Sequence, residues 1–215
     1  VLSGTGGGLI KNGSGILRLT GANTYTGTTE VQADTMVVSS LGSSGSAGAT
    51  SVGDQQTANT AGSAIILGNA TTTGGILQYV GTGETSDRYI RLNGTTASNQ
   101  IHADGSGALI LTNVANDFTT PTGAKTLFLR GSSAAGNMIT SQLTNDGGGG
   151  TLGVTIDGAA TWILTNGANS FTGTTTVSSG ALGIGHDTAI GGAIAVSNGN
   201  VFAYGADRTI ANAIT

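Results

Sequence analysis

Apolar residues recur along the chain in short alternating runs. In ILRL at residues 16–19, for example, Leu17 and Leu19 fall on one face of an extended segment and Arg18 falls on the other. Each run is followed by Gly, Asn, Asp, Ser or Thr, the residues that favour turns. This pattern predicts short β-strands at residues 16–19, 36–38, 64–67, 76–80, 89–92, 108–111, 126–129, 152–156, 162–164, 181–184, 193–196 and 200–204.

We expect an all-β chain with no substantial helix. Glycine and β-branched residues, which are poor helix formers, interrupt every window that is long enough to form one. Strands of about four residues, separated by turn residues, suit a β-sandwich, a barrel or a solenoid. The choice among these three depends on whether the sequence repeats.

One stretch does repeat. LRLTGANTYTGTTEV at residues 17–31 returns as WILTNGANSFTGTTTV at 162–177 and, in degraded form, as LILTNVANDFTTPTG at 109–123. A second motif pairs a strand that bears an aromatic residue with an Asp-Arg step. A segment that recurs within a chain is usually a structural unit that stacks on its own copies. The equivalent positions are Asn23, Asn116 and Asn169; Tyr25, Phe118 and Phe171; Gly27 and Gly173; and the steps Asp87–Arg88 and Asp207–Arg208.

The copies are unequally spaced, which excludes a rigid short-period repeat. The spacing instead fits units that contain several coils, at about residues 1–103, 104–156 and 157–215 of a single solenoid. A coil of three short strands takes roughly 20 residues, so we expect roughly ten coils and a rod about 50 Å long at ~4.8 Å per coil. Inward-facing Leu, Ile and Val would then form one narrow core.

The composition of the chain argues against several kinds of site and partner. The chain has no cysteine, hence no disulfide framework or thiolate metal site, and a net charge of −4, which argues against a nucleic-acid partner. No apolar stretch approaches the ~18 residues needed to span a bilayer, so we expect no membrane insertion by this segment. The first residues lack the features of a signal peptide, and any export signal is expected outside this chain.

The repeated residues resemble a known family. GSGILRLTGANTYTGTTEV and WILTNGANSFTGTTTVSSGALGIG are similar to the autotransporter-associated β-strand repeat, also called the passenger-associated transport repeat. The resemblance covers about half of the chain. It implies a right-handed parallel β-helix in a large bacterial protein that is extracellular or exposed on the cell surface. It also implies a stalk or scaffold with no enzymatic activity.

The sequence gives little evidence of a catalytic, metal-binding or ligand-binding site. The acidic residues mostly stand beside Gly or Ser, where turns are expected, and no carboxylate cluster suggests a glycosidase or lyase. A metal site in NDGGGG at 145–150 is conceivable, but a flexible turn is the preferred interpretation. His102 and His186 lie in different units. The aromatic repeat positions favour core or corner anchors over a sugar-binding row, and Arg88 and Arg208 favour structural pairing. We expect no catalytic residue, metal or cofactor.

We therefore interpret the chain as a non-catalytic structural solenoid. The alternatives are an adhesin that binds a glycan or a host protein along a solenoid face and, less favoured, a carbohydrate-active β-helix enzyme. In an array of repeats, the final segment GADRTIANAIT could be followed directly by a sequence like LSGTGGGLIKNGSG, which stands near the start of this chain. We hypothesise that the chain is one period of a longer array, or a subunit that stacks head to tail into a filament, so that its partner is itself or the flanking repeats.

Overall fold

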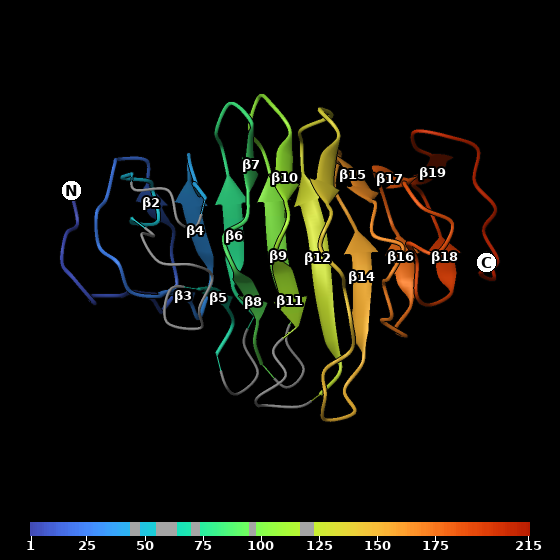
Figure 1. The fold of residues 1–215 in the computed structure, drawn as a ribbon, viewed down its shortest axis with the longest axis horizontal. Helices are drawn as coiled ribbons and strands as arrows, with labels where there is room; N and C mark the ends of the chain where they lie inside the picture. The colour runs from blue at the N-terminus through green and yellow to red at the C-terminus, as the bar shows by residue number, and fades with distance from the viewer. Residues whose placement is uncertain (44–47, 55–63, 70–73, 95–97, 117–122) are drawn as a thin grey trace.

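In a computed structural model, nineteen short strands of the described residues form three parallel sheets, of which one runs from end to end, one ends at Asn116 and one begins at Glu84. The structure describes residues 1–43, 48–54, 64–69, 74–94, 98–116 and 123–215. Every strand pair is parallel, and no helix occurs among these residues. The described residues therefore contain no helix that could cross a membrane. The two termini lie at opposite ends of the long axis (Figure 1).

The three sheets, A, B and C, form the sides of a parallel β-helix. Between residues 65 and 139 the chain visits them in the repeating order A, B, C, whereas it alternates between A and B before residue 65 and between B and C after residue 139. Sheet A contains β1 (Leu9–Lys11), β3 (Thr29–Val31), β5 (Ile65–Leu67), β8 (Ile90–Leu92) and β11 (Val114–Asn116). Sheet B contains β2 (Leu17–Leu19), β4 (Thr35–Val38), β6 (Ile76–Tyr79), β9 (Ser98–Ala103), β12 (Lys125–Gly131), β14 (Leu152–Ile156), β16 (Thr175–Val177) and β18 (Ile194–Val196). Sheet C contains β7 (Glu84–Ser86), β10 (Leu109–Leu111), β13 (Asn137–Ile139), β15 (Thr161–Leu164), β17 (Ala181–Ile184) and β19 (Asn200–Ala203).

The expected all-β parallel β-helix is confirmed, and all twelve predicted strands overlap observed ones. The apolar pattern did not predict seven of the described strands, β1, β3, β7, β9, β11, β13 and β16. The reason is clearest for β7 and β9. Their sequences, ETS and SNQIHA, are mostly polar, and their inward positions include Ser86 and Asn99. The right-handed sense, the count of about ten coils and the division into units at 1–103, 104–156 and 157–215 stay predictions.

The core is a set of apolar rows that run from coil to coil. On sheet B the register joins Met36 to Leu77, Leu77 to Ile101, Ile101 to Leu129, and Leu129 to Ile156. All of these side chains are buried. Burial of a Leu or Ile side chain contributes about 1.5–3 kcal/mol, so each coil is stabilised chiefly by the coils above and below it.

Coil length varies while the register of the core does not. Leu17 and its partner Met36 are 19 residues apart, whereas Met36 and its partner Leu77 are 41 apart. The extra residues lie between strands, where insertions disturb few backbone hydrogen bonds. The sequence could therefore show no fixed period even though the coils stack regularly.

The sequence repeat is also out of phase with the three sides. In the copy at 17–31 the chain runs from β2 in sheet B to β3 in sheet A. In the copy at 162–177 it runs from β15 in sheet C to β16 in sheet B. In these two copies the Asn-containing segment occupies the side between the two strands, whereas in the copy at 109–123 Asn116 ends β11. The repeat is therefore a strand, corner and strand module that begins on more than one side of the helix.

Candidate functional site

The described residues form no ligand pocket and contain no group of His, Asp and Glu side chains arranged to hold a metal ion. The side chains at the repeat positions instead contact neighbouring coils. These contacts between coils are the candidate functional site, because they decide whether the chain can act as a continuous rod.

Asn23 joins three successive coils through its side-chain amide. Its Oδ1 accepts a hydrogen bond from the backbone N–H of Leu2 at 2.8 Å, in the coil before. Its Nδ2 donates to the carbonyl of Ser51 at 2.9 Å, in the coil after. An asparagine amide has one acceptor and one donor side, so it can bridge an N–H and a C=O that the strand ladders do not pair.

Asn169 makes the same pair of contacts in the later copy of the repeat. Its Oδ1 accepts from the N–H of Leu143 at 2.7 Å, and its Nδ2 donates to the carbonyl of Ala189 at 2.6 Å. Asn23 and Asn169 therefore have equivalent bonding although they lie on different sides of the helix. Asn116 ends β11, where its Cα pairs with Leu92.

A further asparagine outside the repeat copies has this geometry. Asn137 is fully buried at the start of β13. Its Oδ1 accepts from the N–H of Leu109 at 3.0 Å, and its Nδ2 donates to the carbonyl of Thr161, also at 3.0 Å. Comparison of the repeats could not find Asn137, because it lies in none of the three copies. We call Asn23, Asn137 and Asn169 the bridging asparagines.

The aromatic positions Tyr25 and Phe171 are both buried. The Tyr25 hydroxyl forms a hydrogen bond with Oγ1 of Thr29 at 2.6 Å, and burial raises the pKa of Tyr25 above its ordinary value. Neither ring is displayed for stacking on a sugar. The third position, Phe118, lies outside the described residues.

Gly27 and Gly173 are positions where the backbones of two coils approach closely. The N–H of Gly27 donates to the carbonyl of Gly7 at 2.8 Å, and that of Gly173 donates to the carbonyl of Leu152 at 3.0 Å. A Cβ atom would lie 2.6 Å from the Gly7 oxygen or 2.5 Å from the Leu152 oxygen. Both distances are below van der Waals contact, so a side chain at either position would separate the coils.

The two Asp-Arg steps lie in different environments. Arg88 is buried and donates from Nη2 to the carbonyl of Val52 at 2.8 Å. Burial lowers the pKa of Arg88 to about 10, although Tyr25 and the acidic groups nearby partly oppose this. Among the described residues, its Nε and Nη1 have no hydrogen-bond partner.

Arg208 is only half-buried. Its Nη1 lies 3.7 Å from the carboxylate of Asp187, and its Nη2 donates to the carbonyl of Tyr204 at 3.0 Å. Asp87 is half-buried and Asp207 is exposed. The shared dipeptide therefore does not give the two arginines the same surroundings.

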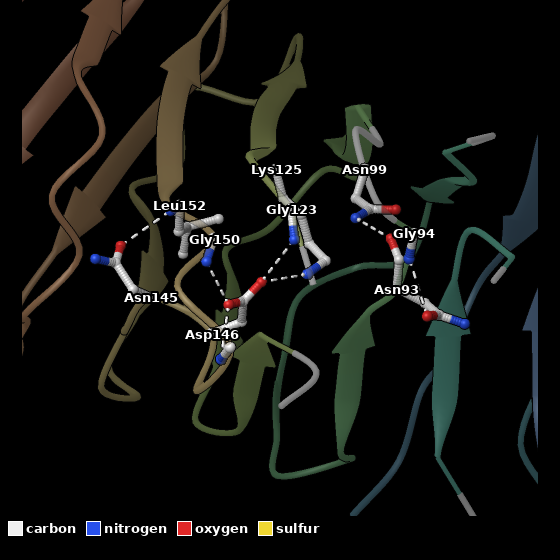
Figure 2. A network of polar contacts seen from close by, with 10 residues as sticks. Asn93, Gly94, Asn99, Gly123, Lys125, Asn145, Asp146, Gly150 and Leu152 are labelled. Carbon is white, nitrogen blue, oxygen red and sulfur yellow. Dashed lines mark hydrogen bonds and ion pairs between the residues drawn. The ribbon is translucent and has the colours of Figure 1, made fainter. Parts of the chain in front are cut away.

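A buried ion pair closes the loop NDGGGG. Oδ2 of Asp146 lies 3.2 Å from Nζ of Lys125, and both side chains are completely buried. Figure 2 shows the carboxylate between Lys125 and the backbones of Gly123 and Gly150, whose N–H groups donate to it at 3.0 and 2.6 Å. Burial alone would raise the pKa of Asp146, but these hydrogen bonds and Lys125 outweigh that effect and lower it.

Asparagine side chains nearby make separate contacts with backbone groups (Figure 2). Oδ1 of Asn145 accepts from the N–H of Leu152 at 3.0 Å, and Nδ2 of Asn99 donates to the carbonyl of Asn93 at 3.1 Å. The sequence identified the glycine-rich loop as a turn. It did not reveal the buried charge pair, because Lys125 stands 21 residues before Asp146 and no local motif joins them.

The two histidines are separate in the structure. His102 lies in β9, with Nε2 at 2.9 Å from Oε1 of Gln100. His186 lies in the segment after β17, with Nδ1 at 3.0 Å from Oγ1 of Thr188. The two residues belong to different sides of the helix and are not brought together.

Two of the bridging asparagines, Asn23 and Asn169, lie within a known repeat. The passenger-associated transport repeat matches residues 9–33, 102–119 and 154–184, which overlap the three copies found by internal comparison. The chain contains passenger-associated transport repeats. No solved structure matches it.

A curated relative agrees with this assignment. The chain is 36% identical over 145 residues to the adhesin BmaC autotransporter of Brucella suis biovar 1 (strain 1330). The match covers 66% of this chain but only 4% of the length of the relative. The chain thus matches a small part of a much longer autotransporter.

Replacement of a bridging asparagine should weaken the stacking of coils. Asn137→Ala leaves the Leu109 N–H and the Thr161 carbonyl without this partner, so we expect the free energy of unfolding to fall by about 1–3 kcal/mol. Urea denaturation followed by circular dichroism measures the change. The matched control is Asn198→Ala at an exposed position, which should stay within about 0.5 kcal/mol of the parent. Equal stabilities of the two variants would contradict the bridging role.

The Lys125–Asp146 pair should make stability depend on pH. The folded-state pKa of Asp146 is lowered, so its stabilising effect is complete above the ordinary Asp value of about 3.9 and is lost as pH falls through the folded value. Urea denaturation between pH 7 and pH 3 should show this loss. Asp146→Asn should cost about 3–5 kcal/mol at pH 7 and flatten the acid dependence.

The control for this titration is Asp187→Asn, which alters a half-exposed carboxylate. It should retain the pH dependence of the parent below pH 4. If Asp146→Asn retained it as well, other carboxylates would be responsible for the acid sensitivity.

Proposed function

We propose that this chain is a structural spacer within the passenger of a bacterial autotransporter, at or beyond the cell surface, and that it has no catalytic role. The transport-repeat matches and the similarity to a named autotransporter support the passenger assignment. The spacer role goes further than these comparisons and rests on the physical properties of the rod.

The observation that carries the proposal is the continuity of pairing between coils. Sheet B joins eight strands, from β2 to β18, without a break in its parallel ladder (Figure 1). The bridging asparagines add side-chain hydrogen bonds between the same coils. Stretching or bending such a rod must break backbone hydrogen bonds in several sheets at once, so the chain is suited to hold other segments at a fixed distance.

The buried polar groups support a non-catalytic interpretation. Asp146 accepts hydrogen bonds from three backbone N–H groups and Lys125, and it is closed off from solvent. Glu84 accepts from the N–H groups of Leu41 and Gly42 at 2.7 and 3.1 Å. These carboxylates hold loops in place, and the Asp146 carboxylate is not available to a substrate.

A second candidate function is adhesion, because the relative is named an adhesin. An adhesive segment needs exposed side chains that are held in place, and the outer face of sheet B carries such side chains. Adhesion and spacing are compatible in one rod, but they make different demands on sequence. A spacer depends on its inward residues, whereas an adhesin depends on its outward ones.

Exchange of the segment in the surface-displayed passenger separates these functions. We expect that replacing residues 1–215 by a transport-repeat block of equal length from elsewhere in the same passenger preserves both surface display and adhesion of the bacteria. Deletion without replacement should reduce adhesion by shortening the rod. Flow cytometry with an antibody against an outer tag measures display, and attachment to cultured cells measures adhesion. Normal display with lost adhesion in the exchanged passenger would refute the spacer role and favour the adhesin.

We further propose that the two open ends of the helix pair with flanking repeats of the same chain. Edge strands present unpaired backbone groups, and apolar side chains are exposed near both ends, with Ile10 and Ile16 at 59% and Phe202 at 37%. The much greater length of the relative favours flanking repeats over a second copy as the partner.

The purified 215-residue chain should therefore form short single rods in negative-stain microscopy over a concentration series. Extension by further repeats at both ends should leave particles of one uniform, greater length. Long fibres of the 215-residue chain, one solenoid wide, would instead show that head-to-tail stacking of copies is the function.

A further inference from the structure

A polar ladder occupies the outer face of sheet B. In the register of the sheet, Gln78 pairs with His102 and His102 with Arg130, while Gln100 pairs with Phe128. Residues between these positions, such as Ile101 and Leu129, point into the core. The outward side chains are half-buried, so each is held by its neighbours and still reaches solvent. The sheet B ladder is defined here as Gln78, Gln100, His102, Phe128, Arg130 and Asp157.

Arg130 organises the middle of the ladder. Its Nη1 donates to Oε1 of Gln100 at 3.0 Å and its Nη2 donates to Oδ2 of Asp157 at 2.6 Å. The guanidinium carbon lies 4.7 Å from the centre of the Phe128 ring, a distance that favours a cation–π contact. The Arg130 side chain therefore fixes an amide, a carboxylate and an aromatic ring on successive coils.

The ends of the ladder are fixed in the same way. Nε2 of Gln78 donates to Oδ2 of Asp104 at 2.8 Å, and Oγ of Ser179 donates to Oδ1 of Asp157 at 3.2 Å. Side chains held by such bonds lose little conformational entropy when a ligand binds. The ladder thus has the preorganisation of a recognition surface, spread over several coils.

The ladder also keeps hydrogen-bonding capacity for a ligand. In the described part of the chain, no hydrogen bond uses Oε1 of Gln78, Nε2 of Gln100 or Nδ1 of His102. Burial lowers the pKa of His102, an effect that Arg130 reinforces and that Asp104 and Asp157 oppose. Donors and acceptors are therefore presented together on one face.

The geometry limits the class of ligand. Since no pocket is present among the described residues, a small molecule would lose little of its surface to this face. A repetitive ligand that crosses several coils would instead gain affinity from each coil in turn. The strand spacing of ~4.8 Å is about the advance of one sugar unit in an extended polysaccharide.

The charges and functional groups of the ladder narrow the class of ligand further. Arg130 is paired with Asp157, and Asp104 adds a second negative charge beside the ladder, so the face does not attract an anionic polymer. Amides, an imidazole and hydroxyls recognise neutral hydroxyl groups, and the Phe128 ring offers an apolar surface for a pyranose. We propose that the sheet B ladder binds a neutral polysaccharide laid across successive coils, an inference that rests on the proposed surface location of the passenger.

Affinity electrophoresis of the 215-residue chain provides the test. Gels contain hydroxyethylcellulose, laminarin or galactomannan as neutral probes, and polygalacturonate as the anionic probe. We expect at least one neutral probe to retard the chain. Phe128→Ala, and Gln100→Ala combined with His102→Ala, should each weaken that retardation about tenfold. These side chains face outward, so circular dichroism should show that both variants keep the β-sheet spectrum of the parent.

The matched control is Met138→Ala, which removes a half-buried outward side chain from sheet C and should bind like the parent. No retardation by any neutral probe, or retardation that both ladder variants retain, would overturn the proposal. Retardation by polygalacturonate alone that disappears in salt would overturn it as well. None of these results affects the spacer role, which the segment exchange tests through display and adhesion. If the folded chain binds no glycan, the proposal for the sheet B ladder fails while the proposal of a spacer role stands.

Discussion

The hydrogen bonds between each short strand and the coils on either side are the constraint on which the rest of the structure depends. Most strands have three to five residues, too few to be stable as isolated pairs. A coil therefore has no stable structure of its own, and its backbone is satisfied only in the stack. This requirement forces equivalent inward positions to align, so that Leu77, Ile101 and Leu129 form one continuous row.

Buried polar side chains follow from the same constraint. At the corners the strands end, and backbone N–H and C=O groups are buried without partners in the ladder. An unpaired buried group costs about 1–3 kcal/mol, so a side chain that pairs two of them removes a large penalty. Asparagine meets this need at Asn23, Asn137 and Asn169. The Lys125–Asp146 pair meets a comparable need, since the Asp146 carboxylate pairs the amides of its own glycine loop.

The sequence predicts the features that are encoded locally. Alternation of apolar residues located β12 and β14, and internal similarity predicted a solenoid and the positions of Asn23 and Asn169. The sequence does not predict contacts that depend on which coil lies next to which. Arg88 and Arg208 share a dipeptide, yet one is buried and the other is half-exposed. Asn137 and Lys125 have no repeat partner in the sequence, because their roles arise only when long and short coils stack in register.

This division between inward and outward positions explains how one rod can combine stability with recognition. The inward row tolerates little change, since every coil shares it with two neighbours. An outward residue such as Phe128 or His102 contacts only its neighbours on the same face, so substitution there leaves the stack intact. Loops between strands are equally free, as the 41-residue coil between Met36 and Leu77 demonstrates. Selection can thus change the surface of a passenger of this kind coil by coil, while the hydrogen-bond ladders keep its length and stiffness constant.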